Sequence, residues 1–298
     1  MALDRSNRYP GRFENPTTAQ PQGAFKNRTS PTAEDGSYFE ADWANDMSGF
    51  FARILNVAGV TPNGTVDSGT SSQLYDAMLS ATPGRLLNIQ TFFTSGTYTP
   101  TPGTKRVIVE MVGGGGGGAG SRAAPSGNTS LGGSGGAGSY LKAMYTSGFS
   151  GVQVTVGSGG NGGTVSNPYA SNGSASSFGS LCSAAGGSAG EPAGPSNSYP
   201  FTTTAAVVSN AHSGSGIIFA TPGSGSGSSV AMDEFTRIGF PGASSQFGAG
   251  GYITATDAPG IQGTGYGSGG GPTVVTSGKS AVAGGKGANG IVIIWEYS

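Results

Sequence analysis

The chain has 298 residues, of which 58 are glycine and one is cysteine, and its net charge is −1 at pH 7. The near-neutral charge argues against a molecule drawn as a whole to nucleic acid or anionic membrane. A lone cysteine, Cys182, excludes an intrachain disulfide and CxxC metal sites, and we expect it to be a small buried residue. With no signal sequence and no apolar run of roughly 18 residues, we expect a soluble protein not exported by its own sequence.

Composition divides the chain near Leu87. Residues 1–87 hold 8 of the glycines and 16 of the 29 charged residues, whereas residues 88–298 hold 50 glycines and 13 charged residues. We therefore predict three parts: an extended arm over 1–37, a helical head over 38–87, and a glycine-rich β domain over 88–298.

The arm is rich in proline, asparagine, threonine and arginine and has no sustained hydrophobic period. Arg5, Arg8 and Arg12 stand out because few acidic residues lie near them in sequence. This composition is typical of a disordered leader. The alternative is an arm that becomes ordered only against a neighbouring protein.

The head begins with one helical stripe, because its large apolar residues recur at spacings of three and four. Gly59 is well placed to end this helix, and a shorter helix is predicted over 71–79. A pair of helices this short buries little surface, so the stripe needs a partner: the rest of the chain, another copy, or a different protein. The candidate contacts between copies are Trp43, Met47, Phe50 and Ile54.

Four segments of the glycine-rich part alternate as strands do. They are 107–112, 140–145, 152–156 and 291–297, and an earlier pair over 89–93 and 96–99 precedes them. Between the strands lie glycine blocks without a strict Gly-X-Y triplet, which argues against collagen. The alternatives are flexible linkers and polyglycine-II-like segments that bond main chain to main chain. We favour ordered segments because good strands bracket the blocks.

Several motifs of this part follow one another in a fixed order: Thr91–Pro100, Val107–Gly116, Gly138–Lys142, Val152–Gly163, Ser176–Gly179 and Gly290–Tyr297. This series resembles the glycine-rich terminal domain of bacteriophage tail fibres over roughly residues 88–298. Residues Glu40–Met47, followed by Asp67–Leu79, are similar to the attachment end of such fibres. The resemblance implies an elongated homotrimer in the distal tail of a virion, made in the host cytoplasm. Its expected fold is mainly β, with a small helical head and a sandwich-like glycine-rich domain.

The resemblance also implies a receptor-binding protein whose N-terminal part, including Arg5, Arg8 and Arg12, attaches to tail or baseplate proteins. Its partner on the bacterium would be a polysaccharide, a pilus or an outer-membrane protein. Loops between glycine blocks would carry specificity, and we expect Tyr199 and Phe201 to be an exposed pair. Phe240 has a second interpretation, as a ring that covers bare glycine backbone. The candidate contacts are Tyr169, Tyr199, Phe201, His212, Phe235, Arg237 and Phe240.

Two other classes of protein remain as alternatives. A polysaccharide-degrading tail spike needs two placed carboxylates, but Glu110 and Glu296 fall in predicted strands, and Asp233 and Glu234 are adjacent. No nucleophile, metal or phosphate-loop motif accompanies His212, so we expect neither an enzyme nor a cofactor. A purely structural glycine-rich protein would be repetitive throughout, which the helical head does not fit.

Overall fold

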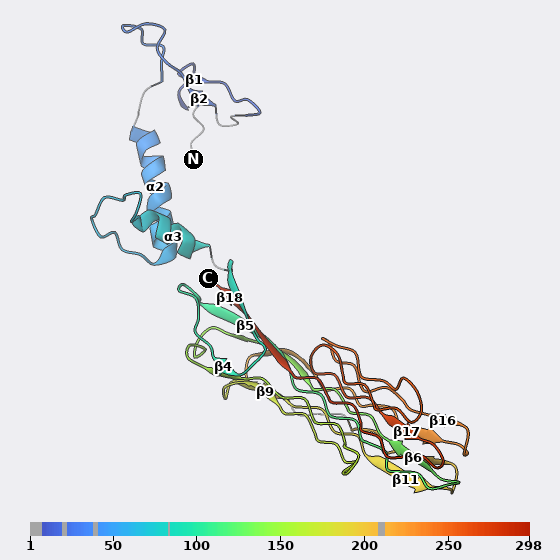
Figure 1. Cartoon of the computed structure of the whole chain (residues 1–298). Helices are drawn as coiled ribbons and strands as arrows, with labels where there is room; N and C mark the ends of the chain where they lie inside the picture. The colour runs from blue at the N-terminus through green and yellow to red at the C-terminus, as the bar shows by residue number, and fades with distance from the viewer. Residues whose placement is uncertain (1–7, 20–22, 38–40, 83, 208–211) are drawn as a thin grey trace. The chain divides into compact units, whose positions relative to one another are not determined.

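The computed structural model describes residues 8–19, 23–37, 41–82, 84–207 and 212–298 (Figure 1). The chain forms two compact units, Met1–Pro83 and Gly84–Ser298. The fold is mainly β with a small helical N-terminal part, as the sequence predicts. The division falls before Leu86 and Leu87, which belong to a strand of the second unit and not to the helical head.

The described part of the arm is folded, with a two-stranded antiparallel sheet of β1 (Phe13–Glu14) and β2 (Ala24–Phe25). Rings of Phe13 and Phe25 lie 5.2 Å apart, and Phe25 meets the ring of Trp43 edge-on at 5.6 Å. This row of aromatic rings joins the sheet to the first helix. The described part of the arm is therefore neither extended throughout nor a disordered leader.

The two helices of the first unit are α2 (Ala41–Ala58) and α3 (Gln73–Ala81). Ser72 caps α3 by accepting the N–H of Tyr75 on its hydroxyl, and Gly59, with a φ of 68°, follows the end of α2. No residue of α2 is buried, and Phe50 is 55% exposed. Neither helix is long and apolar enough to cross a membrane, among the residues described.

The second unit begins with two five-stranded sheets that pack face to face. One has the order β14 (Ile217–Thr221), β7 (Tyr140–Tyr145), β5 (Arg106–Val112), β18 (Ile291–Tyr297) and β3 (Leu86–Phe92). The other has the order β13 (His212–Gly214), β10 (Cys182–Ala184), β9 (Ser176–Phe178), β8 (Gln153–Thr155) and β4 (Gly96–Thr97). All their pairings are antiparallel.

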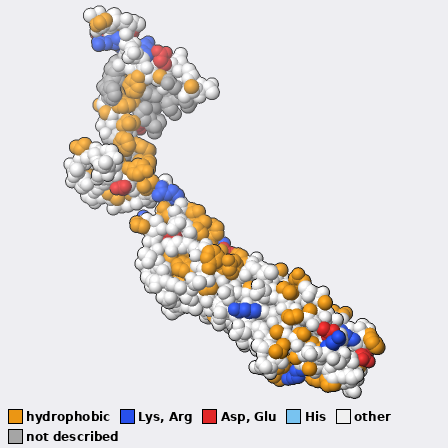
Figure 2. All heavy atoms as spheres, viewed as in Figure 1, with side chains coloured by type: hydrophobic (Ala, Val, Ile, Leu, Met, Phe, Trp, Pro, Cys, Tyr) orange, Lys and Arg blue, Asp and Glu red, His pale blue; other side chains and the backbone are white. Residues whose placement is uncertain are grey.

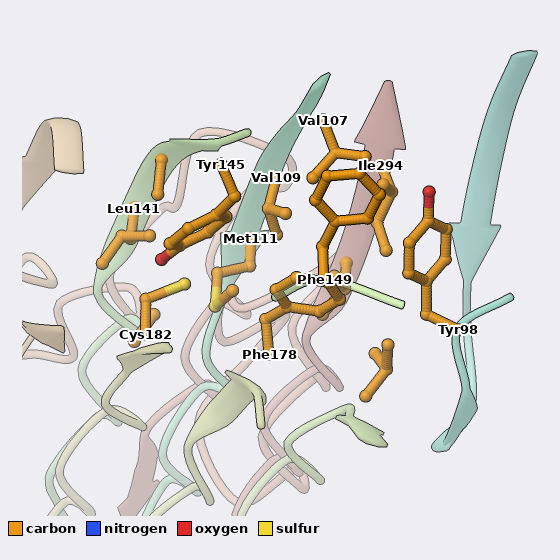
Figure 3. Close-up of a cluster of buried hydrophobic side chains, with 14 residues drawn as sticks. Tyr98, Val107, Val109, Met111, Leu141, Tyr145, Phe149, Phe178, Cys182 and Ile294 are labelled. Carbon is orange, nitrogen blue, oxygen red and sulfur yellow. The ribbon is translucent and has the colours of Figure 1, made fainter. Parts of the chain in front are cut away.

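The core of this sandwich follows from the period-two pattern of its strands. Val107, Val109 and Met111 of β5 point inward and are fully buried, together with Phe178 of β9 (Figure 3). Cys182 is buried in the same core, as predicted. Burial raises the pKa of its thiol, although hydrogen bonds with Tyr145 and Phe178 act in the opposite direction.

Beyond the sandwich, the glycine blocks form an ordered bundle of extended segments. The N–H groups of residues 113–121 all donate to backbone oxygens, at distances of 2.7–3.0 Å. Their direction repeats every three residues. Gly113, Gly116 and Ala119 donate to segment 133–139. Gly114, Gly117 and Gly120 donate to segment 168–174, and Gly115, Gly118 and Ser121 donate to segment 282–288. Three residues per turn is the geometry of polyglycine II.

The segment 113–121 is also an acceptor on its other sides. Carbonyls of Gly114 and Gly117 accept from Gly187 and Gly190, and those of Gly115 and Gly118 accept from Gly160 and Gly163. The carbonyl of Gly116 accepts from Gly270. Six segments therefore surround this one. Because each buried N–H and C=O needs a partner, this lattice satisfies the backbone without a β-sheet.

The lattice has no room for side chains at these positions. A Cβ added at any residue of Gly113–Gly118 would lie 1.9–2.2 Å from a backbone oxygen of a neighbouring segment. Real Cβ contacts are never that short, so the close approach of the backbones requires glycine. The lattice thus replaces the packing of side chains by the packing of main chains.

Strands of the sandwich continue directly into segments of the lattice. β5 continues into segment 113–121, segment 133–139 leads into β7, and segment 282–288 leads toward β18. The change from strand to glycine at Val112–Gly113 is therefore the point where the sandwich ends. The lattice links the sandwich to the small sheets of the unit, of which β6, β11, β16 and β17 lie at the end away from the C-terminus (Figure 1). We call this the distal end.

Candidate functional site

Two three-stranded sheets form the distal end of the second unit. One has the order β11 (Pro192–Ser196), β6 (Thr129–Gly132) and β17 (Thr273–Val275). The other has the order β12 (Phe201–Thr202), β15 (Val230–Ala231) and β16 (Arg237–Ile238). A small core of Leu131, Ala231 and Val274 lies among these strands. The loops between the strands are thereby held on a packed base.

Tyr199 and Phe201 belong to this base and are only half-exposed. Their rings lie 5.8 Å apart and pack against the small core, and the Tyr199 hydroxyl is 3.0 Å from Oγ1 of Thr129. The expectation of an exposed pair is therefore wrong. The reason is that Phe201 lies opposite Ala231 in the register, so its side chain points to the same face as this residue of the small core.

Phe235 is the most exposed large apolar side chain of this end, at 85%. A carboxylate oxygen of Asp233 accepts the N–H groups of Phe235 at 2.7 Å and Thr236 at 2.6 Å. The N–H of Met232 donates to the carbonyl of Thr236 at 2.9 Å, which closes the turn. These hydrogen bonds hold the pKa of Asp233 below its usual range. A fixed turn therefore presents Phe235 to solvent.

Other exposed apolar side chains surround this turn in sequence. Met232 is 54% exposed, Ile238 51% and Phe240 42%. Ile238 lies on the face of β16 opposite to the small core, because it pairs with Val230 and not with the buried Ala231. Met232 directly follows β15, and Phe240 lies two residues after β16. We call Met232, Phe235, Ile238 and Phe240 the tip patch. Figure 2 shows hydrophobic side chains among acidic and basic ones at this end.

Arg237 and Phe240 have specific neighbours. Arg237 pairs with Ala231, and its side chain is half-buried with an unpaired Nε. A Cβ added at Gly227 would lie 2.9 Å from Cβ and Cγ of Phe240, so this side chain covers bare backbone. The interpretation of Phe240 as a ring that covers bare glycine is confirmed, and the ring is also 42% exposed.

Tyr169 and His212 contact other elements than β15 and β16. The guanidinium of Arg122 stands over the Tyr169 ring at 5.7 Å and donates to the carbonyl of Gly194 at 2.9 Å. His212 is exposed on β13, where it pairs with Ala184 of the sandwich. Of the predicted contacts, Phe235, Arg237 and Phe240 thus lie in or within two residues of β16, whereas Tyr199 and Phe201 pack against the small core.

Carboxylates of the second unit serve as hydrogen-bond acceptors within the fold. Glu110 accepts the Tyr140 hydroxyl at 2.6 Å, and Glu296 accepts the Tyr98 hydroxyl at 2.6 Å. Asp257 accepts the N–H and the hydroxyl of Thr276 at 2.7 and 2.8 Å. Within the described part of the chain, no group of three His, Cys, Asp or Glu side chains is placed to hold a metal ion. The distal end instead exposes apolar side chains.

The candidate residues of the first unit also have contacts within the chain. Arg8 forms an ion pair with Asp42 at the start of α2, which raises the pKa of its guanidinium. Trp43 packs on Phe25, whereas Phe50 stays exposed. Met47 and Ile54 are half-exposed on the same helix. Arg5 lies outside the described residues, and Arg12 lines a cavity with Arg28 and Glu34.

The sequence reasoning missed Met232 and Ile238 of the tip patch. No alternation signals them, because Val230, Ala231 and Met232 are consecutive apolar residues and two polar residues separate Phe235 from Ile238. Comparison with protein families finds that the family described as the glycine-rich domain matches residues 91–297. No curated protein matches the chain.

Proposed function

The chain belongs to the glycine-rich domain family, and from that premise we propose that it is a bacteriophage tail-fibre protein. The tip patch would bind a receptor on the bacterial surface without catalysis and without a cofactor. The N-terminal unit would attach the protein to tail or baseplate proteins of the virion, and three copies would associate through α2. Nucleic acid has no part in this function.

The observation that carries the proposal is the exposure of Phe235 on a turn held by hydrogen bonds. A ring that is 85% exposed gains from burial in a pocket of a partner. Because the turn is already ordered, little conformational entropy is lost when a partner binds. The lattice behind it gives a rigid support, as a receptor-binding tip requires.

The exposed helix supports association of copies. Large apolar residues of α2 recur at spacings of four and three, which is the pattern of a seam between helices: Trp43, Met47, Phe50 and Ile54. No residue of α2 is buried within the chain. Since most helical stability in proteins comes from packing of an apolar face, a second copy would supply what the single chain lacks. Three tips on one fibre would also bind more tightly than one.

The test is binding of the purified full chain to bacterial cells, with Phe235→Ala compared with Val165→Ala. Val165 is also exposed, at 62%, and lies outside the tip patch. We expect Phe235→Ala to weaken binding about tenfold or more, the effect of losing a hot spot of roughly 1.4 kcal/mol, while Val165→Ala binds as the parent does. Host mutants that lack pili, lipopolysaccharide or single outer-membrane proteins would then identify the receptor. Equal binding by the parent, Phe235→Ala and Val165→Ala would contradict the assignment of the tip patch as the receptor-binding surface.

A further inference from the structure

The outer face of the five-stranded sheet with β5 and β18 carries a row of large apolar side chains. In the register of the sheet, Ile89 lies opposite Trp295, Trp295 lies opposite Ile108, and Ile108 lies opposite Met144. Directly opposed residues of a sheet point to the same face. These four are therefore neighbours on the face that looks away from the sandwich core, and we call them the sheet row.

The sheet row is partly exposed in the single chain. Ile89 is 43% exposed and Met144 39%, and the side chains of Ile108 and Trp295 are half-buried. The adjacent row adds Ile293 and, at the edge of the sheet, the 55%-exposed Phe219. Hydrophobic side chains gather over the region of β5 and β18 in Figure 2. An apolar surface of this kind on a soluble protein marks a contact with another protein.

Two opposite charges lie beside the sheet row. Glu110 and Lys142 are directly opposed on β5 and β7. Glu110 accepts the Tyr140 hydroxyl, whereas the side chain of Lys142 has no hydrogen bond or ion pair among the described residues. A surface that carries one acid and one base next to each other is complementary to another copy of itself. A partner surface of one sign would leave one of the two charges unmatched.

We propose that the sheet row is a contact surface for a second copy of this chain, with Lys142 of one copy meeting Glu110 of the other. The inference rests on the proposed association of copies and adds a contact in the second unit that is separate from α2. It is independent of the tip patch, which lies at the other end of the unit.

The experiment uses the full chain with cysteines introduced at Ile89 and Met144. The sole native cysteine, Cys182, is buried, so oxidation reports on the introduced thiols. We expect disulfide-linked multimers from Ile89→Cys/Met144→Cys on a denaturing gel. The matched control is Val165→Cys/Tyr169→Cys, at positions 62% and 55% exposed outside the sheet row, and we expect it to stay unlinked. An equal yield of multimers from both pairs, or none from the first, would overturn the proposal.

A second measurement is the dissociation constant of the assembly by sedimentation. We expect Met144→Glu to raise it at least tenfold while the circular dichroism stays that of the parent, and Val165→Glu to leave it unchanged. Met144→Glu that keeps the parent's dissociation constant but loses cell binding would make the sheet row a receptor surface instead. Met144→Glu that changes neither property would overturn the proposal. The cell binding of Phe235→Ala tests the receptor role of the tip patch and does not test the contact between copies at the sheet row.

Discussion

The hydroxyl of Tyr98 donates a 2.6 Å hydrogen bond to the carboxylate of Glu296, 198 residues later in the chain. Both residues are fully buried. The same carboxylate accepts the Gln90 amide at 2.9 Å and the N–H of Thr101. This network ties the last strand of the sandwich to the segment that joins its two sheets, so the first and last parts of the second unit are held together.

Tyr98→Phe removes one hydrogen bond to a buried charge, and we expect it to lower the free energy of unfolding of the second unit by about 1.5–3 kcal/mol. Urea unfolding followed by tryptophan fluorescence measures this. In a Trp43→Phe background, Trp295 of β18 reports on this unit alone. The control is Tyr252→Phe at a 54%-exposed ring, and equal midpoints for the two variants would contradict the importance of the network.

The same network makes the stability of the second unit depend on pH. Burial alone would raise the pKa of Glu296, but hydrogen bonds from Thr101, Tyr98 and Gln90 outweigh it and hold the pKa below its ordinary value of 4.5. Because the pKa is lower in the folded state, the stabilisation is present above pH 4.5 and is lost as the pH falls through the folded pKa. We expect Glu296→Gln to flatten the decline of the urea midpoint below pH 4.5. An unchanged pH profile would assign that decline to other groups.

Gly116→Ala tests the packing of the lattice. Its Cβ would lie 1.9 Å from the carbonyl oxygen of Ser188, whereas a Cβ at Gly96 would meet its nearest atom, in Phe92, at 3.6 Å. We expect Gly116→Ala to destabilise the second unit by about 3 kcal/mol or more, because backbone on both sides must move. Gly96→Ala is the matched control and should change stability little. A Gly116→Ala protein as stable as the control would mean that the segments do not approach this closely.

Asp233→Ala tests how the turn presents Phe235. Without the carboxylate, the N–H groups of Phe235 and Thr236 lose their acceptor, and the ring loses its fixed position. We expect cell binding to weaken several-fold while the urea midpoint of the second unit is kept. Glu234→Ala, which removes the adjacent charge, should bind as the parent does. Weaker binding by both variants alike would attribute the effect to charge.

The long strands of the sandwich and the two helices could be predicted because side chains mark their period. The short strands β6, β9–β13 and β15–β17 were not predicted. Alternation over 107–112 and 291–297 predicted β5 and β18. It also indicated that Glu296 is buried, because Glu296 lies on the same face of β18 as the buried Val292 and Ile294. The partners of each glycine block could not be predicted, because residues without side chains leave no pattern that selects a neighbour. The burial of Phe201 depended on its register with Ala231, which no local signal fixes.

The most direct test of the central claim, that main-chain packing orders the glycine segments, is hydrogen exchange at the amides of Gly113–Gly118. All six N–H groups have backbone acceptors within 3.0 Å, and we expect all six to exchange together, slowly, and with the protection of the buried sandwich strands. Exchange of these amides at the rate of an unfolded chain, while β5 stays protected, would contradict the lattice.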